Sequence, residues 1–272
     1  MTKWSIVVCG VCYFSFASVY AQEKKHGRLP DTECAFSQYA STHTTKQAFL
    51  YFLDSSGIVF NKGLPYNGLA VWRQQPENNF KLRWHPAYYV VSADESLGFT
   101  TGPYEAGNNP NTFFGNFTSI WRKDANNNWK LLADLGTNYA SSLYDTLVPK
   151  TFSHLIPATG KDTVALFIEQ QFITLFEQQG IEAYKTVVNK ATWLNMDKHH
   201  PAKTPENIYH QLTSLQQDIH FTPIAGGISG THDLAYVYGT ITSKQGKENY
   251  LRVWGHTNSG WIILCQVIKI VD

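Results

Sequence analysis

The chain has 272 residues, of which 43% are hydrophobic and 14% are aromatic, and its formal net charge at pH 7 is +1. This length is sufficient for two domains that each bury a core of their own. The chain lacks the basic surplus that is typical of proteins that bind nucleic acid or an anionic membrane, so we expect neither partner.

The N-terminal segment is typical of a secretory signal peptide. Lys3 supplies a short basic region, an apolar run covers residues 4–16, and residues 19–21 (Val-Tyr-Ala) fit the small-x-small cleavage rule. The apolar run is too short to be a convincing spanning helix. We therefore expect a signal peptide over residues 1–21 and a periplasmic or secreted protein that is not held at the membrane after cleavage. Retention of the segment as an anchor is the alternative.

The mature chain would hold two cysteines, Cys34 and Cys265. The first falls in an expected helix and the second in the last expected strand, and neither has a CxxC partner. This pattern predicts two separate, buried thiols that behave as small hydrophobic residues, with one cross-domain disulfide as the alternative.

The first half of the mature chain predicts helices followed by strands. We expect a helix from about Thr32, a second helix capped by Thr44 or Thr45, a short strand at 58–60 and a third helix at 69–74. Residues 84–135 then alternate aromatic and β-branched residues with polar ones and are broken by turn sequences, which indicates an antiparallel sheet.

The second half repeats this order. Residues 139–161 contain prolines and a glycine without a sustained period and are interpreted as a linker. An amphipathic helix capped by Asp162 or Thr163 follows and ends at Gly180, and later come a short strand from Trp193, a helix capped near Thr204 and further strands. The predicted domains are therefore 30–138 and 162–272.

Matching residues support a repeat of one module, although a single large α+β domain is the alternative. Residues 84–86 (Trp-His-Pro) align with 221–223 (Phe-Thr-Pro), and 97–99 (Leu-Gly-Phe) align with 234–236 (Leu-Ala-Tyr). Trp121 and Trp129 correspond to Trp254 and Trp261, whereas Asp134 is matched by Gln266.

The motifs of the first copy are W-x-P at 84–86, L-G-F-T-T-G-x-Y at 97–104, W-R-K at 121–123 and W-K-L-L-x-D-x-G at 129–136. In this order they resemble the DUF4440/SnoaL-like branch of the NTF2-like superfamily. The resemblance implies an α+β fold of two tandem cystatin/NTF2-like cones, in which N-terminal helices pack on a curved antiparallel sheet around an open-ended pocket. The many aromatic residues suit such a pocket and its core.

The resemblance also implies candidate site residues, because ketosteroid isomerases and polyketide cyclases of this superfamily use a pocket carboxylate or histidine as a base. The catalytic candidates are Asp134, an acid in an apolar strand, His85, and Asp54 after the second helix, and the alternative for each is a structural, hydrogen-bonded role. The expected pocket residues of the two cones are Trp84, His85, Tyr88, Tyr104, Trp121, Asp134, Trp193, His220 and Tyr238.

Other motifs predict neither a metal nor a cofactor. His199 and His200 have no third ligand at fixed spacing, and the glycine-rich residues 225–230 lie between expected strands. Asn116 begins a glycosylation sequon, but it falls in a strand, and the resemblance suggests a bacterial source.

The sequence therefore favours an exported, non-catalytic protein that binds a small, partly apolar molecule. The alternative is an isomerase, cyclase or dehydratase that transfers protons in the first pocket, which predicts a carboxylate or histidine with a perturbed pKa opposed by a donor. A third possibility is an assembly module whose sheet faces pair in a homodimer or within the chain, which predicts filled cones and an exposed apolar patch.

Overall fold

The computed structural model describes residues 27–77, 80–108, 111–158, 165–215 and 218–270. The expected signal peptide at 1–21 and the helix cap expected at Asp162 or Thr163 lie outside the described residues. None of the helices within these ranges is long and apolar enough to cross a membrane.

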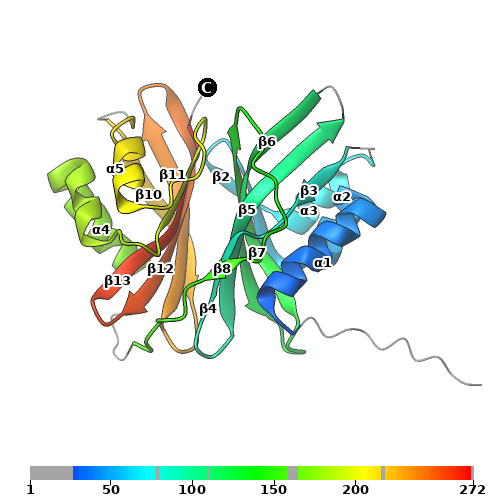
Figure 1. Ribbon diagram of the computed structural model, residues 1–272, viewed down its shortest axis with the longest axis horizontal. Coiled ribbons are helices and arrows are strands. Elements are labelled where there is room, and N and C mark those ends of the chain that lie inside the picture. The colour runs from blue at the N-terminus through cyan, green and yellow to red at the C-terminus, as the bar shows by residue number, and fades with distance from the viewer. Residues whose placement is uncertain (1–26, 78–79, 109–110, 159–164, 216–217, 271–272) are drawn as a thin grey trace, which may run out of the picture.

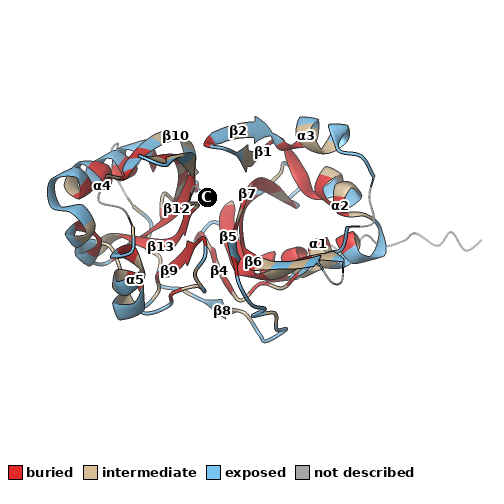
Figure 2. Ribbon diagram, turned by 90° about the horizontal axis from the view of Figure 1, so that it is seen from above, coloured by how far each residue is buried: buried red, intermediate tan, exposed pale blue. Residues whose placement is uncertain are grey.

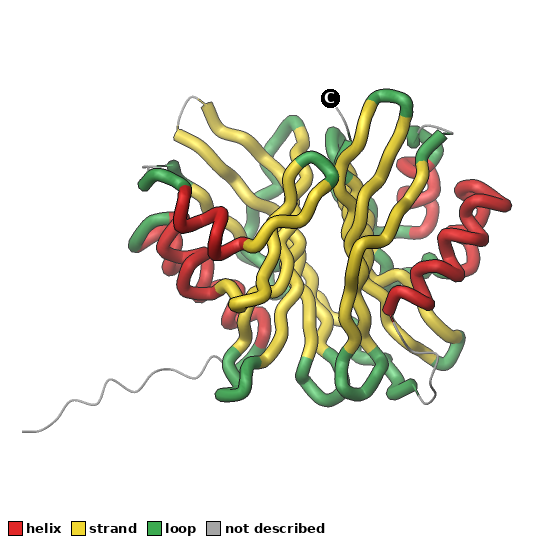
Figure 3. Tube along the Cα trace, turned by 180° about the vertical axis from the view of Figure 1, so that it is seen from behind, coloured by secondary structure: helices red, strands yellow, loops and turns green. Residues whose placement is uncertain are grey.

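The chain forms two units, each with helices on one face of a sheet (Figure 1). The helices lie on the two outer flanks, and the two sheets face each other in the centre. Seen from above, the strands of the first unit curve around its helices, and buried residues gather on both sides of the central sheets (Figure 2). The layers are therefore helix, sheet, sheet and helix, which Figure 3 shows from behind.

The first unit begins with three helices, α1 (Leu29–Thr42), α2 (Thr45–Phe52) and α3 (Gly68–Gln74). The predicted cap of α2 is confirmed, because Thr44 and Gln47 form a reciprocal capping box. Its strands are β1 (Leu53–Asn61), β2 (Leu64–Asn67), β3 (Leu82–Trp84), β4 (Tyr88–Val91), β5 (Leu97–Asn108), β6 (Asn111–Lys123), β7 (Trp129–Tyr139) and β8 (Lys150–Thr151). They pair in the order β2-β1-β7-β6-β5-β4-β8, with β3 on β5.

The second unit contains α4 (Ala165–Gln179), a 3-10 helix η1 (Gly180–Thr186) and α5 (Pro205–Leu212), which Thr204 caps as predicted. Its strands are β9 (Trp193–Met196), β10 (His220–Ile228), β11 (Leu234–Ser243), β12 (Gly246–Thr257) and β13 (Gly260–Ile268). They pair in the order β10-β11-β12-β13-β9.

The two sheets have the same connectivity. In each, consecutive long strands are antiparallel, while the first strand of the unit lies parallel to the last, as in the pairs β1–β7 and β9–β13. The fold is therefore α+β, with two successive units, the cones, that each pack helices on one face of a sheet. The stretch expected to be a linker also contributes β8, whose Lys150 N–H donates to the Ala87 carbonyl beside β4.

The described core has three parts, one inside each cone and one between the sheets. The part between the sheets combines residues of both units, such as Phe99 and Leu132 from the first with Leu251 and Leu264 from the second. A buried polar cluster crosses it, in which Asn195 donates to Thr101 at 2.9 Å and Asn116 donates to Asn195 at 3.2 Å. The sequon at Asn116 is therefore buried between the units.

Both cysteines are free, as predicted, but the prediction that both are buried is wrong for Cys34. Cys265 is fully buried in β13, whereas Cys34 is partly exposed on α1, and its sulfur lies 3.8 Å from Nδ1 of His85.

Candidate functional site

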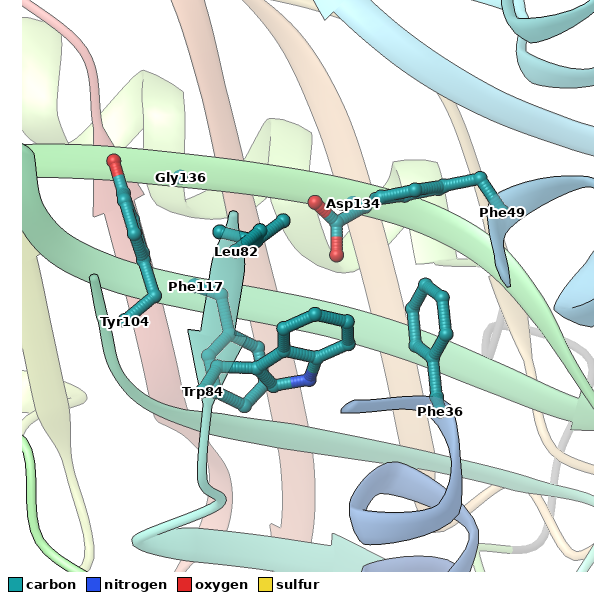
Figure 4. Close-up of a pocket in the computed structure, with 8 residues that line it drawn as sticks. All are labelled: Phe36, Phe49, Leu82, Trp84, Tyr104, Phe117, Asp134 and Gly136. Atoms are coloured by element: carbon teal, nitrogen blue, oxygen red, sulfur yellow. The ribbon is translucent and has the colours of Figure 1, made fainter. Parts of the chain in front are cut away.

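A cavity of about 230 Å³ lies inside the first cone, between α1, α2 and the sheet (Figure 4). Aromatic and aliphatic side chains form most of its wall, and one carboxylate points into it. The lining residues are Phe36, Phe49, Leu82, Trp84, Tyr104, Phe117, Asp134 and Gly136.

Small residues on the central strands leave this space open. Ser119 on β6 pairs with Asp134 on β7, and Phe117 pairs with Gly136 two positions along. Gly136 has no side chain to fill the cone, and the ring of Tyr104 packs over it. The cavity thus lies over Gly136, with Ser119 buried behind Asp134, in a sheet otherwise lined by large residues.

Asp134 is the polar group of the cavity. Its Oδ2 accepts a hydrogen bond of 2.7 Å from Ser119, which is the only partner that the described residues give this carboxylate. The side chain keeps some exposure to the cavity. Burial raises the pKa of Asp134 to about 6, and the hydrogen bond from Ser119 opposes that rise only in part. A group in this state can accept a proton or bind a positive charge near neutral pH.

A second acid, Glu33, lies beneath the cavity on α1 and is fully buried. It accepts hydrogen bonds from Nε1 of Trp84 at 2.5 Å, from Thr100 at 2.5 Å and from Nε1 of Trp121 at 2.8 Å. Burial raises the pKa of Glu33 to about 7 against these hydrogen bonds, and the nearby negative charge of Asp134 adds to the rise.

The sequence analysis missed Glu33, although a signal for it exists. Leu29, Phe36 and Ala40 are buried on one face of α1, and Glu33 falls on that face at helical spacing. An acid inside an apolar stripe must find partners or a cavity, so its position marks it as unusual.

None of the described residues that line the cavity presents a free hydrogen-bond donor to Asp134 from the opposite wall. The hydroxyl of Tyr104 donates to Oδ1 of Asn138 at 2.5 Å, and Figure 4 shows it pointing away from the carboxylate. Burial also raises the pKa of Tyr104. Since the indole N–H of Trp84 is used by Glu33, the remaining wall offers carbon atoms.

The cavity brings together three of the predicted pocket residues, Trp84, Tyr104 and Asp134, and Trp121 lies fully buried beneath it. His85 does not line it. As the neighbour of Trp84 in an extended segment, its ring turns elsewhere, and Nε2 lies 3.2 Å from the carbonyl of Leu147.

Asp54 also lies outside the described lining of the cavity. Its carboxylate accepts hydrogen bonds from the backbone and hydroxyl of Ser56, both at 2.8 Å, and pairs with Arg122 at 3.1 Å. Burial alone would raise the pKa of Asp54, but these partners outweigh it and hold the pKa below its usual range. The geometry fits the structural alternative for this acid.

Four further predicted pocket residues are placed away from the cone cavities. The rings of Tyr88 and Trp193 stack at 5.1 Å between the units, where they line an open groove of about 540 Å³. Tyr238 packs against Phe60 across the two sheets at 5.4 Å, and His220 is exposed at the start of β10. Both faces of each sheet are buried, so an aromatic residue in a strand can point toward either face.

In the second cone a salt bridge occupies the corresponding place. Arg252 is fully buried on β12, and its Nη1 donates to Oε1 of Glu169 on α4. Its Nε donates to Gln266 on β13 at 3.1 Å, while Trp254 donates to Glu169 at 2.8 Å. Glu169 therefore matches Glu33, since each accepts the indole N–H of the equivalent tryptophan at 2.8 Å.

Metal binding has no structural support in the part of the chain that the structure describes, where no three His, Cys, Asp or Glu side chains gather as ligands.

Comparison with known proteins gives structural likeness only. No family model and no curated protein matches the sequence. Solved structures similar to part of the chain include nuclear transport factor 2 from Cryptosporidium parvum, with 17% identity over 39% of this chain and 90% of that one and a TM-score of 0.33. A ketosteroid isomerase-like protein from Erwinia carotovora atroseptica has 19% identity over 41% and 98%, with a TM-score of 0.31.

An NTF2-like protein from Cytophaga hutchinsonii is similar at 19% identity over 40% of this chain and 97% of that one, with a TM-score of 0.31. Each of these proteins is about as long as one unit of the present chain. At such scores the likeness carries no argument about activity or ligand.

Proposed function

We propose that the protein is an exported, non-catalytic binder of a small, partly apolar molecule, which it holds in the cavity of the first unit. The observation that carries this proposal is an apolar cavity with a single carboxylate, Asp134, that has one hydrogen-bond partner among the described residues. Ligand sites commonly combine apolar walls with a few polar groups that fix the orientation of the ligand.

The size of the cavity restricts the ligand. Its volume of about 230 Å³ lies below the roughly 300–1,000 Å³ of sites for drug-sized molecules, so we expect a ligand of one ring or a short chain. Export is proposed from the signal-like residues 1–21, and the motifs at 84–136 support assignment to the DUF4440/SnoaL-like branch with a duplicated module. The sheet pairing is proposed to serve packing within the chain rather than recruitment of another copy.

The alternative is proton-transfer catalysis by Asp134, as in an isomerase, cyclase or dehydratase. The pKa of about 6 favours it, because a base with such a pKa is partly ionised near neutral pH. Such reactions also need a donor that stabilises the developing oxyanion, and the described lining offers none that is free of another partner. Ligand binding therefore explains the arrangement of residues in the cavity better than proton-transfer catalysis does.

Native mass spectrometry of the exported, purified protein tests the proposal. We expect a co-purified small molecule in the wild type, and its loss in Gly136→Leu, which fills the cavity. Glu95→Gln is the matched control, because Glu95 pairs with Lys123 at the surface. A ligand that survives Gly136→Leu in a folded protein would place binding elsewhere. Incorporation of solvent deuterium into the released molecule, dependent on Asp134, would instead support catalysis.

A further inference from the structure

The two cones can be compared position by position because their registers agree. On the middle strand, Phe117, Ser119 and Trp121 follow the same i, i+2, i+4 spacing as Tyr250, Arg252 and Trp254. Ser119 pairs with Asp134, as Arg252 pairs with Gln266. On the helices, Glu33 and Phe36 match Glu169 and Phe172 in spacing. The edge residue Trp84 pairs with Tyr104 as Phe221 pairs with Ile241.

In the second cone the guanidinium of Arg252 lies in an aromatic cage. Its central carbon is 4.4 Å from the ring centroid of Phe172, 4.8 Å from that of Phe221 and 5.2 Å from that of Tyr250. Aromatic faces at these distances attract cations. Together with Glu169 and Gln266, the cage holds the guanidinium of the chain itself, although Nη2 of Arg252 has no hydrogen-bond partner among the described residues.

The first cone has aromatic rings at the equivalent positions but no arginine among them, and its Phe36 and Trp84 contact each other edge to face with centroids 4.7 Å apart. Phe36, Trp84 and Phe117 stand at the positions of the three caging rings, and all three line the cavity. Ser119 stands where the second cone has Arg252, so the volume of the arginine side chain is left open. The cavity is thus the counterpart of a space that holds a guanidinium in the other unit.

The charged residues of the two cones also indicate a cationic occupant for the first. The second cone sets one acid, Glu169, against one cation. The first cone retains the equivalent acid, Glu33, and adds Asp134 in place of the neutral Gln266, while no Lys, Arg or His is found in the described lining. Two neighbouring acids without a cation favour a positively charged ligand.

We propose that the cavity of the first unit binds an organic cation, a guanidinium or primary ammonium on a short apolar stem, held against the aromatic wall of Phe36, Trp84 and Phe117 and facing Asp134. This inference rests on the proposed binding function and names the class of its ligand. The charged head takes the place that Arg252 takes in the second unit, and the stem contacts the apolar wall formed by Leu82 and Phe49. Leu82 also lines an open outer groove of about 730 Å³, so the groove and the cavity share this wall residue.

Calorimetric titration of the full mature chain, after removal of any co-purified molecule, tests the charge requirement. The probes are butylguanidinium, its neutral isostere butylurea, and pentanol as a purely neutral apolar probe. We expect butylguanidinium to bind about tenfold or more tightly than butylurea at pH 8. We also expect this preference to shrink at pH 5, where Asp134 and the neighbouring Glu33 are both mostly protonated and offer little charge.

Two variants localise the preference. Asp134→Asn should remove it while leaving the weak binding of butylurea, whereas the surface control Glu95→Gln should retain it. Equal binding of butylurea and butylguanidinium, or a preference that persists in Asp134→Asn, would overturn the cation inference and leave the binding function intact. Failure of all three probes to bind a folded wild type would count against both proposals.

Discussion

Ser119 and Arg252 occupy the same register position in the two sheets, one opposite Asp134 and the other opposite Gln266. This exchange, together with Gly136 at the position of the buried Ile268, distinguishes the contents of the two cones. Arginine fills the second cone with a buried ion pair, whereas serine leaves a cavity beside an acid in the first. The two cones thus share an architecture, and the residues at these positions leave a cavity in the first and a filled core in the second.

The buried ion pair leads to a prediction about stability. Arg252→Met should lower the free energy of unfolding by about 3–5 kcal/mol, because it leaves the carboxylate of Glu169 buried without a cation. Urea denaturation measures the change. The double variant Arg252→Met with Glu169→Gln should recover most of the loss, since it removes the uncompensated charge. Lys185→Met, in an exposed pair with Glu182, is the control and should change little.

A loss for Arg252→Met that is no larger than for Lys185→Met would mean that Glu169 is not charged in the folded protein. Glu169 and Glu33 would then resemble each other only in the hydrogen bonds that they accept, and not in carrying a charge.

Ser119→Arg should convert the first cone to the arrangement of the second. Its guanidinium can reach Glu33 and Asp134 from the position that Arg252 takes relative to Glu169, so we expect a folded protein that no longer binds ligand. Ser119→Leu is the matched control, because it fills the same space without a charge. The arginine variant should be more stable than the leucine variant by about 1–3 kcal/mol at pH 8, because the arginine side chain can form charged hydrogen bonds that the leucine side chain cannot. Equal stability in urea denaturation would contradict this.

Asp134 should make stability depend on pH. Its folded pKa of about 6 lies above the unfolded value of 3.8, so the folded state binds more protons between these values and stability falls as the pH rises through them. Asp134→Asn removes this penalty and should be more stable than wild type at pH 8 by about 1–3 kcal/mol. The advantage should vanish near pH 3.5. Glu33, with a pKa of about 7, faces the same region and retains its own decline in the variant.

Denaturation at pH 3.5, 6 and 8 measures this difference. A variant that is less stable than wild type at pH 8 would mean that Asp134 holds the fold together, and its assignment to a ligand site would then fail.

Much of the fold could be predicted because its signals are local. The side chains of Thr44 and Thr204 cap helices by accepting a hydrogen bond from the backbone N–H three residues later. Alternation of residue types within residues 84–135 indicates the strands. The difference between Asp134 and Gln266 was also visible from the aligned motifs. These features need no knowledge of which elements pack together.

The remainder depends on contacts between distant segments. The hydrogen bond from Trp121 to Glu33 joins residues 88 positions apart, and no spacing rule predicts it. Tyr88 and Tyr238 were expected in pockets but lie between the sheets. Because each sheet is apolar on both faces, alternation shows that a residue is inside but not whether it faces the cone or the other unit.

The apolar layer between the sheets should make the two units unfold together. Leu251 and Leu264 of the second unit are fully buried in one cluster with residues of the first, so neither sheet can lose its partner without exposing this surface. We expect one calorimetric transition for the whole described fold. Leu264→Asp should lower the free energy of unfolding by more than about 4 kcal/mol, because it places a charge in this layer. The transition should move to a lower temperature and remain single. Leu147→Asp, on an exposed leucine, is the matched control. Two separated transitions, with only the second unit shifted by Leu264→Asp, would show that the layer joins the units without coupling their stability.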